Sequence, residues 1–235
     1  MKNIDTIKID KLNTKMVAHR GVSKIEPENT LKTFELAGKK SYYGIECDVH
    51  VTKDKKYVIN HDFSLLRTYD VDITIEDSTL NELKKVNHPI NNVPLPEYYE
   101  YLEICKKYLK TAVVELKGVY TFDDIEGLIK ETKKYYNLEN IIFIAFDLIN
   151  LINLRKLLPE QRLQYLTSEF NEDVFDALNK FNLDLDIKHT ALTEEIVNKV
   201  KKNNHIINCW TVDEKETGEK YTAWDIDLIT TNILE

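Results

Sequence analysis

Short runs of apolar, mostly β-branched residues recur along the chain, and most of them precede a stretch with helical periodicity. A strand buried on both faces has such a continuous apolar run, whereas a surface helix has apolar residues three and four positions apart. Eight runs predict strands, at residues 15–20, 43–51, 111–117, 140–146, 162–167, 183–187, 206–212 and 226–230. Amphipathic stretches predict helices at 29–40, 122–136, 147–157, 172–181, 193–203 and 213–223.

Three of the predicted helices begin at residues that favour a helix N-terminus. Thr121 is followed three positions later by Asp124, and Asp213 is followed three positions later by Glu216. Thr193 opens a further helix. The side-chain oxygen of such a residue accepts a hydrogen bond from a free backbone N–H of the first turn. We therefore expect these residues to cap their helices.

Alternation of strands and helices predicts parallel βαβ units. Eight strands in this order close most simply into a TIM (β/α)8 barrel, and the 235 residues suit one such barrel. An open doubly wound sheet is the competing arrangement, but no glycine-rich phosphate loop follows the first strand. No linker rich in proline, glycine or serine divides the chain, so we expect one domain over residues 1–235.

One segment breaks the strand–helix rhythm. Residues 62–110 follow the second predicted strand, with a short helix at 79–86, a turn between prolines and a longer helix at 96–109. This small insertion is expected either to shape a substrate pocket or only to stabilise the barrel.

Composition narrows the class of protein. Hydrophobic residues make up 43% and charged residues 31%, which is typical of a folded globular chain. The net charge of −8 disfavours nucleic acid as a partner. We also expect no stable membrane association, because no run approaches the length of a membrane span and the N-terminus lacks a secretory signal. Cys47, Cys105 and Cys209 lie in apolar surroundings and predict free thiols in a reducing compartment, which favours the cytoplasm.

Two histidines and two acids are the strongest candidates for chemistry. His19 and His61 each follow an apolar run, and Glu46 and Asp48 are two positions apart on one predicted strand, so both carboxylates point to the same side. Such carboxylates repel each other unless a cation lies between them, and oxygen ligands favour Mg²⁺ or Ca²⁺. Two imidazoles near a bound cation suit the cleavage of a phosphodiester, one as acid and one as base.

Other candidates are less specific. Arg20 is suited to bind phosphate, or to form a structural ion pair. Glu115 and Lys117 share one side of the third predicted strand. There Glu115 is suited to complete the cation site and Lys117 to contact phosphate, or the two form a surface salt bridge. Trp210 either walls a substrate pocket or packs in the core. Asp62 is expected to orient an imidazole or to cap a turn.

Several motifs occur in the order and spacing of a known family. They are His19-Arg20-Gly21, Pro27-Glu28-Asn29-Thr30, Glu46-Cys47-Asp48, His61-Asp62, Glu115-Leu116-Lys117 and Trp210-Thr211-Val212-Asp213. Together they resemble the glycerophosphodiester phosphodiesterase family. The resemblance is dense over residues 17–68, and between 120 and 205 only the fold supports it.

The resemblance implies a TIM barrel with a segment inserted after its second strand. It implies hydrolysis of glycerophosphodiesters to sn-glycerol 3-phosphate and an alcohol, with one divalent cation. His19 and His61 match the family's acid/base pair. The family's metal ligands correspond to Glu46, Asp48 and Glu115, and its phosphate-binding cations correspond to Arg20 and Lys117. Two alternatives remain: a phospholipase D-like enzyme acting on lysophospholipids, with an apolar rim that Tyr98, Tyr99 and Tyr101 help to form, and an inactive relative that binds phosphate esters. The alcohol, the cation and the oligomeric state stay open.

Overall fold

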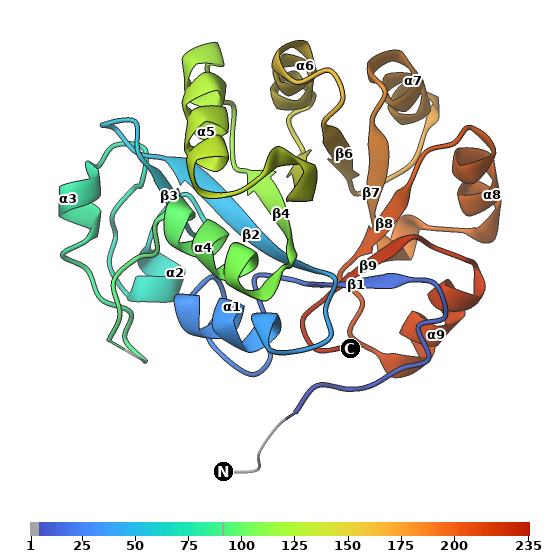
Figure 1. Ribbon diagram of the computed structural model, residues 1–235, viewed down its shortest axis with the longest axis horizontal. Helices are drawn as coiled ribbons and strands as arrows, with labels where there is room; N and C mark the ends of the chain where they lie inside the picture. Colours follow the sequence, from blue (N-terminus) through green and yellow to red (C-terminus); the bar gives the residue numbers. More distant parts are fainter. Residues whose placement is uncertain (1–4, 91) are drawn as a thin grey trace.

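Eight parallel strands form a closed barrel with helices on its outside (Figure 1), in a computed structural model that describes residues 5–90 and 92–235. The first strand pairs with the last as well as with the second, which closes the ring. The TIM barrel predicted from the sequence is therefore confirmed. Its strands are β1 (Lys15–Ala18), β2 (Gly44–Val51), β4 (Thr111–Leu116), β5 (Ile141–Ala145), β6 (Arg162–Thr167), β7 (Asp184–Lys188), β8 (Ile207–Trp210) and β9 (Leu228–Thr231).

The predicted helices lie between these strands, with ends that differ by a few residues. The caps at Thr121 and Thr193 are confirmed, since their side chains accept from the backbone N–H of Asp124 and Ile196. The cap predicted at Asp213 is wrong, because Asp213 accepts hydrogen bonds from the residue after β9 instead. The helices are α1 (Leu31–Gly38), α5 (Phe122–Tyr135), α6 (Leu148–Leu157), α7 (Glu172–Phe181), α8 (Glu194–Lys202) and α9 (Lys215–Ala223).

The segment between β2 and β4 contains a strand that the sequence analysis did not predict. β3 (Tyr57–Ile59) pairs antiparallel with the end of β2 and lies outside the parallel ring. The short helices α2 (Leu66–Tyr69) and α3 (Leu80–Leu83) follow, and then α4 (Tyr98–Tyr108) packs between α1 and α5 as a barrel helix (Figure 1). A small separate core supports this segment, formed by Val58, Leu65, Tyr69, Ile75, Leu83 and Leu95.

Alternation along the strands divides the buried residues into two layers. Cys47 and Cys209 point outward into the core between barrel and helices, and with Cys105 they are buried free thiols, as predicted. Val113 and Ile144 point inward, where they form an apolar layer of the barrel interior. Among the described residues, no helix has the length and apolar character needed to cross a bilayer.

The side chain of Glu235 ties the first described residues to the barrel. Its carboxylate accepts hydrogen bonds from the Ser41 backbone N–H, at 2.7 Å, and from the Thr6 hydroxyl. Burial alone would raise the pKa of Glu235, but these donors outweigh it and lower the pKa to about 2. The ionised carboxylate therefore stabilises the folded chain.

Glu235→Gln is expected to lower the free energy of unfolding near neutral pH by up to about 3 kcal/mol. Because the folded-state pKa is depressed, this stabilisation is present above the pKa of the unfolded chain, near 4.5, and disappears as pH falls toward 2. Urea denaturation of both proteins near pH 7 and near pH 3 measures the effect. The exposed Glu160→Gln serves as the control. An equal deficit of Glu235→Gln at both pH values would contradict the prediction.

Candidate active site

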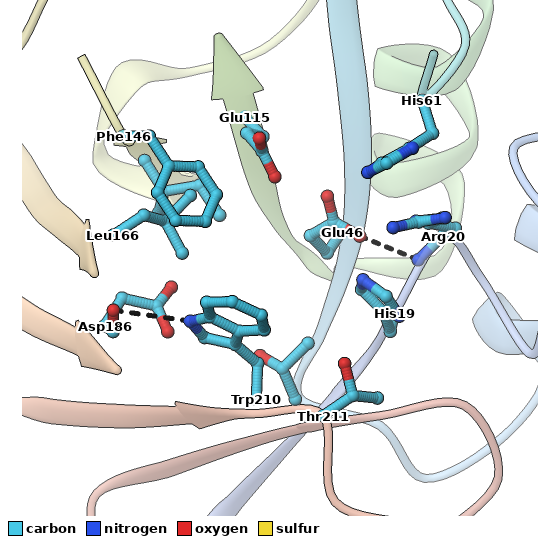
Figure 2. Close-up of a pocket in the computed structure, with 12 residues that line it drawn as sticks. His19, Arg20, Glu46, His61, Glu115, Phe146, Leu166, Asp186, Trp210 and Thr211 are labelled. Carbon is cyan, nitrogen blue, oxygen red and sulfur yellow. Dashed lines mark hydrogen bonds between the residues drawn. The ribbon is translucent and has the colours of Figure 1, made fainter. Parts of the chain in front are cut away.

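A cavity of about 290 Å³ opens at the carboxyl ends of the barrel strands (Figure 2). This is the end at which (β/α)8 barrels place functional side chains. His19 and His61 lie on one side of the cavity, and Trp210 and Asp186 lie on the other (Figure 2). The cavity is lined by His19, Arg20, Glu46, His61, Glu115, Ile144, Phe146, Leu166, Asp186, Trp210, Thr211 and Thr230.

Three carboxylates meet beside the cavity. Glu46 and Asp48 point inward from β2, and the parallel register places Asp48 opposite Glu115 on β4. One oxygen of each of the three lies within 4.8 Å of the others, and all three residues are buried. The sequence spacing predicted the first pair, and the pairing of β2 with β4 adds the third acid.

The three acids affect one another's ionisation. Burial, and then the charges of Asp48 and Glu115, raise the pKa of Glu46 well above its ordinary value. Burial and Asp48 raise the pKa of Glu115 to about 7. Burial would also raise the pKa of Asp48, but Lys117 and Arg20 outweigh it and lower that pKa. The two basic side chains, Arg20 and Lys117, thus face three acidic ones, so the cluster favours binding of a further positive charge.

The donor atoms fit a divalent cation. Glu46 Oε1 and Asp48 Oδ1 are buried and have no hydrogen-bond partner within the described ranges, although Lys117 Nζ lies 3.5 Å from the latter. Buried oxygen atoms without donors are costly unless another group binds them. An all-oxygen ligand set suits Mg²⁺ or Ca²⁺ better than Zn²⁺. The residues present therefore fit the cation that the sequence predicted.

The ring of His19 is oriented by a residue from the far end of the sequence. Its Nδ1 lies 2.8 Å from Asn232 Oδ1, and Asn232 Nδ2 donates to Asp213 Oδ2 at 2.7 Å. Because the side-chain N–H of Asn232 donates to Asp213, the side-chain oxygen of Asn232 accepts a hydrogen bond from His19 Nδ1. Nε2 of His19 is then the ring nitrogen that remains available to a substrate. Burial, and then Arg20, lower the pKa of His19 to about 4, so the ring is neutral at pH 7.

His61 follows β3 and has its own carboxylate. Its Nδ1 lies 2.6 Å from Asp62 Oδ1, and Arg67 Nε donates to Asp62 Oδ2 at 2.7 Å. The hydrogen bond from Arg67 lowers the pKa of Asp62 to about 2. Of the two roles considered for Asp62, the geometry matches orientation of an imidazole.

Arg20 and Lys117 are both ion-paired. Arg20 lines the cavity, with Nη1 3.0 Å from Glu28 Oε1 and Nε 3.3 Å from Asp48 Oδ2. Lys117 Nζ lies 2.8 Å from Glu115 Oε1, and Lys117 is not part of the cavity lining. Phosphate binding by these two residues stays a prediction.

Trp210 forms a wall of the cavity. Its ring meets that of Phe146 edge to face, with centroids 5.6 Å apart, and its indole Nε1 lies 3.4 Å from the main-chain oxygen of Asp186. The sequence analysis did not identify Phe146, Asp186 or Asn232. The available signal was their position in the chain: Phe146 and Asn232 directly follow β5 and β9, and Asp186 lies two residues before the end of β7.

Comparisons with known proteins agree with this geometry. Residues 19–235 match the model of the glycerophosphoryl diester phosphodiesterase family. A glycerophosphodiester phosphodiesterase of Caldanaerobacter subterraneus subsp. tengcongensis is 32% identical over 230 residues, which cover 94% of this chain and 95% of the relative. An enzyme of the same name from Bacillus altitudinis is 29% identical over 231 residues, covering 93% and 94% of the two chains.

Solved structures share the fold. A phosphodiesterase of Oleispira antarctica, in complex with the product sn-glycerol-3-phosphate, superposes with a TM-score of 0.88 at 24% identity and covers 96% of each chain. A glycerophosphodiester phosphodiesterase of Parabacteroides distasonis gives a TM-score of 0.83 at 28% identity, over 94% of this chain and 93% of its own. With the family match over residues 19–235, the chain belongs to the glycerophosphoryl diester phosphodiesterase family and is a phosphoric diester hydrolase.

Proposed function

We propose that this enzyme hydrolyses glycerophosphodiesters to sn-glycerol 3-phosphate and an alcohol, with one divalent cation, Mg²⁺ or Ca²⁺. The observation that carries the proposal is the cluster of Glu46, Asp48 and Glu115 in one site with His19 and His61. The relatives' names and the product bound to the Oleispira antarctica enzyme support the substrate class. Residues 1–235 act as one domain in this proposal, and the buried free thiols favour the cytoplasm.

His19 and His61 divide the proton transfers. His19 is neutral, with Nε2 available, and removes the proton of the attacking oxygen, which belongs to water or to the neighbouring glycerol hydroxyl. His61 donates a proton to the leaving alkoxide, and Asp62 orients the imidazole for this transfer through its contact with Nδ1. Arg20 contributes positive charge toward the phosphoryl oxygens. When bound by the three acids, the cation supplies the larger positive charge there.

Release of glycerol 3-phosphate tests this proposal directly. The protein is incubated with glycerophosphocholine, glycerophosphoethanolamine and glycerophosphoglycerol, then stripped with a chelator and supplied with Mg²⁺ or Ca²⁺ in turn. We expect turnover that the chelator abolishes and one cation restores. Turnover that persists after complete removal of metal would contradict the cation requirement, and no release from any diester would contradict the substrate class.

An exposed apolar rim favours a second candidate, a phospholipase D-like activity on lysophospholipids. Tyr98 and Tyr101 are buried and do not form the rim suggested from the sequence. Phe63, Val119 and Phe146 do expose apolar surface on the loops that follow β3, β4 and β5. Comparing turnover of lysophosphatidylcholine with that of glycerophosphocholine discriminates the two, and faster cleavage of the lipid would favour this candidate.

Trp210→Ala is expected to raise KM for glycerophosphocholine about tenfold with a smaller change in kcat, because the indole face contacts bound substrate rather than the reacting bonds. Steady-state kinetics measure both constants. Trp224→Ala is the matched control, since Trp224 packs against Tyr221 on the outside of the barrel. An unchanged KM in Trp210→Ala would show that Trp210 only packs in the core.

A further inference from the structure

One acidic side chain of the cavity has no part in the mechanism above. Asp186, on β7, lies across the cavity from His19 and His61, and its carboxyl group points toward the space between them (Figure 2). The residue is only 1% exposed. Its Oδ2 accepts a hydrogen bond from Asn208 Nδ2 at 3.1 Å, whereas Oδ1 has no hydrogen-bond partner in the described part of the chain. A buried oxygen left in this way costs free energy unless a ligand binds it.

A buried polar layer beneath the cavity positions this carboxyl group. Asn208 Nδ2 also lies 3.0 Å from Thr230 Oγ1 and 3.4 Å from Gln164 Oε1, and all these residues are buried. They come from the neighbouring strands β6 to β9. Apolar side chains would fill the same volume without the cost of burying polar groups. The layer therefore suggests a role beyond packing.

The surroundings of Asp186 indicate which chemistry it recognises. Its neighbours in the cavity include Leu166 and Trp210, and the basic residues of the cavity lie on the opposite side (Figure 2). Burial, and then the charge of Glu115, raise the pKa of Asp186 well above its ordinary value. A carboxyl oxygen accepts a hydrogen bond from a hydroxyl group, so Oδ1, which has no partner among the described residues, matches a hydroxyl group of the substrate.

We propose that Asp186 is a specificity-determining residue that hydrogen-bonds the terminal hydroxyl of the substrate's glycerol, the hydroxyl farther from the phosphate. This inference rests on the proposed function. In the proposed mechanism the phosphate lies at the acids and histidines. Because Asp186 lines the same cavity, one half of the diester extends toward it. A buried, rigidly positioned group suits the half that is the same in every substrate, which is the glycerol. The variable alcohol then extends toward the open mouth.

Kinetics with two substrates test this assignment in the cation-loaded enzyme. Glycerophosphocholine carries the terminal hydroxyl, and 2-hydroxypropyl phosphocholine lacks only that group. The native enzyme is expected to prefer glycerophosphocholine in kcat/KM by about 10- to 100-fold, because the shorter substrate leaves the carboxyl group unpaired. In Asp186→Ala the preference is expected to shrink to about threefold or less, mainly through slower cleavage of glycerophosphocholine.

The strand itself provides a matched control. Asp184 lies two residues earlier on β7, also faces inward, and lines a separate cavity at the opposite end of the barrel. Asp184→Ala is expected to retain the native preference between the two substrates. Asp186→Asn keeps the size and hydrogen-bonding capacity of the side chain, so it is expected to retain part of the preference and remains informative if the alanine variant does not fold.

Three results would overturn the inference. Equal slowing of both substrates in Asp186→Ala and Asp186→Asn would assign Asp186 a structural role only. Equal cleavage of both substrates by the native enzyme would show that the terminal hydroxyl is not recognised. If an Asp186 variant instead changes only the ratio of kcat/KM between glycerophosphocholine and glycerophosphoglycerol, the alcohol and not the glycerol lies beside Asp186. Failure of the proposed function is distinct, because the native enzyme would then cleave neither substrate.

Discussion

Replacing His19 or His61 by alanine is expected to lower kcat for glycerophosphocholine by about 10²- to 10⁴-fold, with little change in the thermal midpoint. Each substitution removes one proton-transfer group from the cavity and leaves the barrel strands intact. The two rings have separate partners, Asn232 for His19 and Asp62 for His61, so neither variant disturbs the other ring directly. Release of glycerol 3-phosphate under saturating substrate gives kcat.

The chain offers a matched control for the histidine variants. His205 lies before β8, at the opposite end of the barrel, and its ring contacts Asn179. His205→Ala is expected to have native kcat. Near-native turnover in His19→Ala or His61→Ala would rule out the two-histidine mechanism, and a comparable loss in His205→Ala would show that the assay reports on folding.

Removal of one acid from the cluster is expected to have an effect of similar size on cation binding. Glu115→Gln should weaken binding of Mg²⁺ or Ca²⁺ about 100-fold, because it removes one anionic oxygen ligand and its charge. Without cation the variant should be at least as stable as the native protein, since burial and Asp48 already oppose ionisation of Glu115. Turnover should fall at low cation concentration and recover partly at high concentration.

Thermal unfolding provides a readout that does not depend on activity. A cation at about 100 times its dissociation constant stabilises the native protein by about 2.7 kcal/mol, which corresponds to about 5–10 °C in a chain of this size. The same cation concentration should hardly change the midpoint of Glu115→Gln. Glu139→Gln, an exposed substitution at the other end of the barrel, should respond like the native protein. Equal cation-induced shifts in Glu115→Gln and the native protein would exclude Glu115 as a ligand.

Local sequence patterns were sufficient to predict most of the barrel. A parallel strand covered on both faces must be apolar along its length, so eight runs such as 43–51 and 140–146 were recognisable without any tertiary information. β3 was missed because its Tyr57–Ile59 run is short and pairs antiparallel with β2. Asp213 was misassigned because its partner, Asn232, is distant in the sequence.

The candidate site was predictable where a local signal sufficed: His19 and His61 each follow an apolar run, and neighbours in the sequence share one side of a strand. The inward direction of Glu46 and Asp48 follows from strand alternation, and strand periodicity also relates Glu115 to Lys117. The contact between His19 and Asn232 joins residues 213 positions apart, and it exists only because β9 pairs with β1. Asp186 likewise became a candidate only once the structure showed its hydrogen bond with Asn208 and its place in the cavity lining. Periodicity determines which side of a strand a residue occupies. Which residues meet in the site depends on closure of the barrel, because closure brings the carboxyl ends of strands that are far apart in the sequence to one end of the barrel.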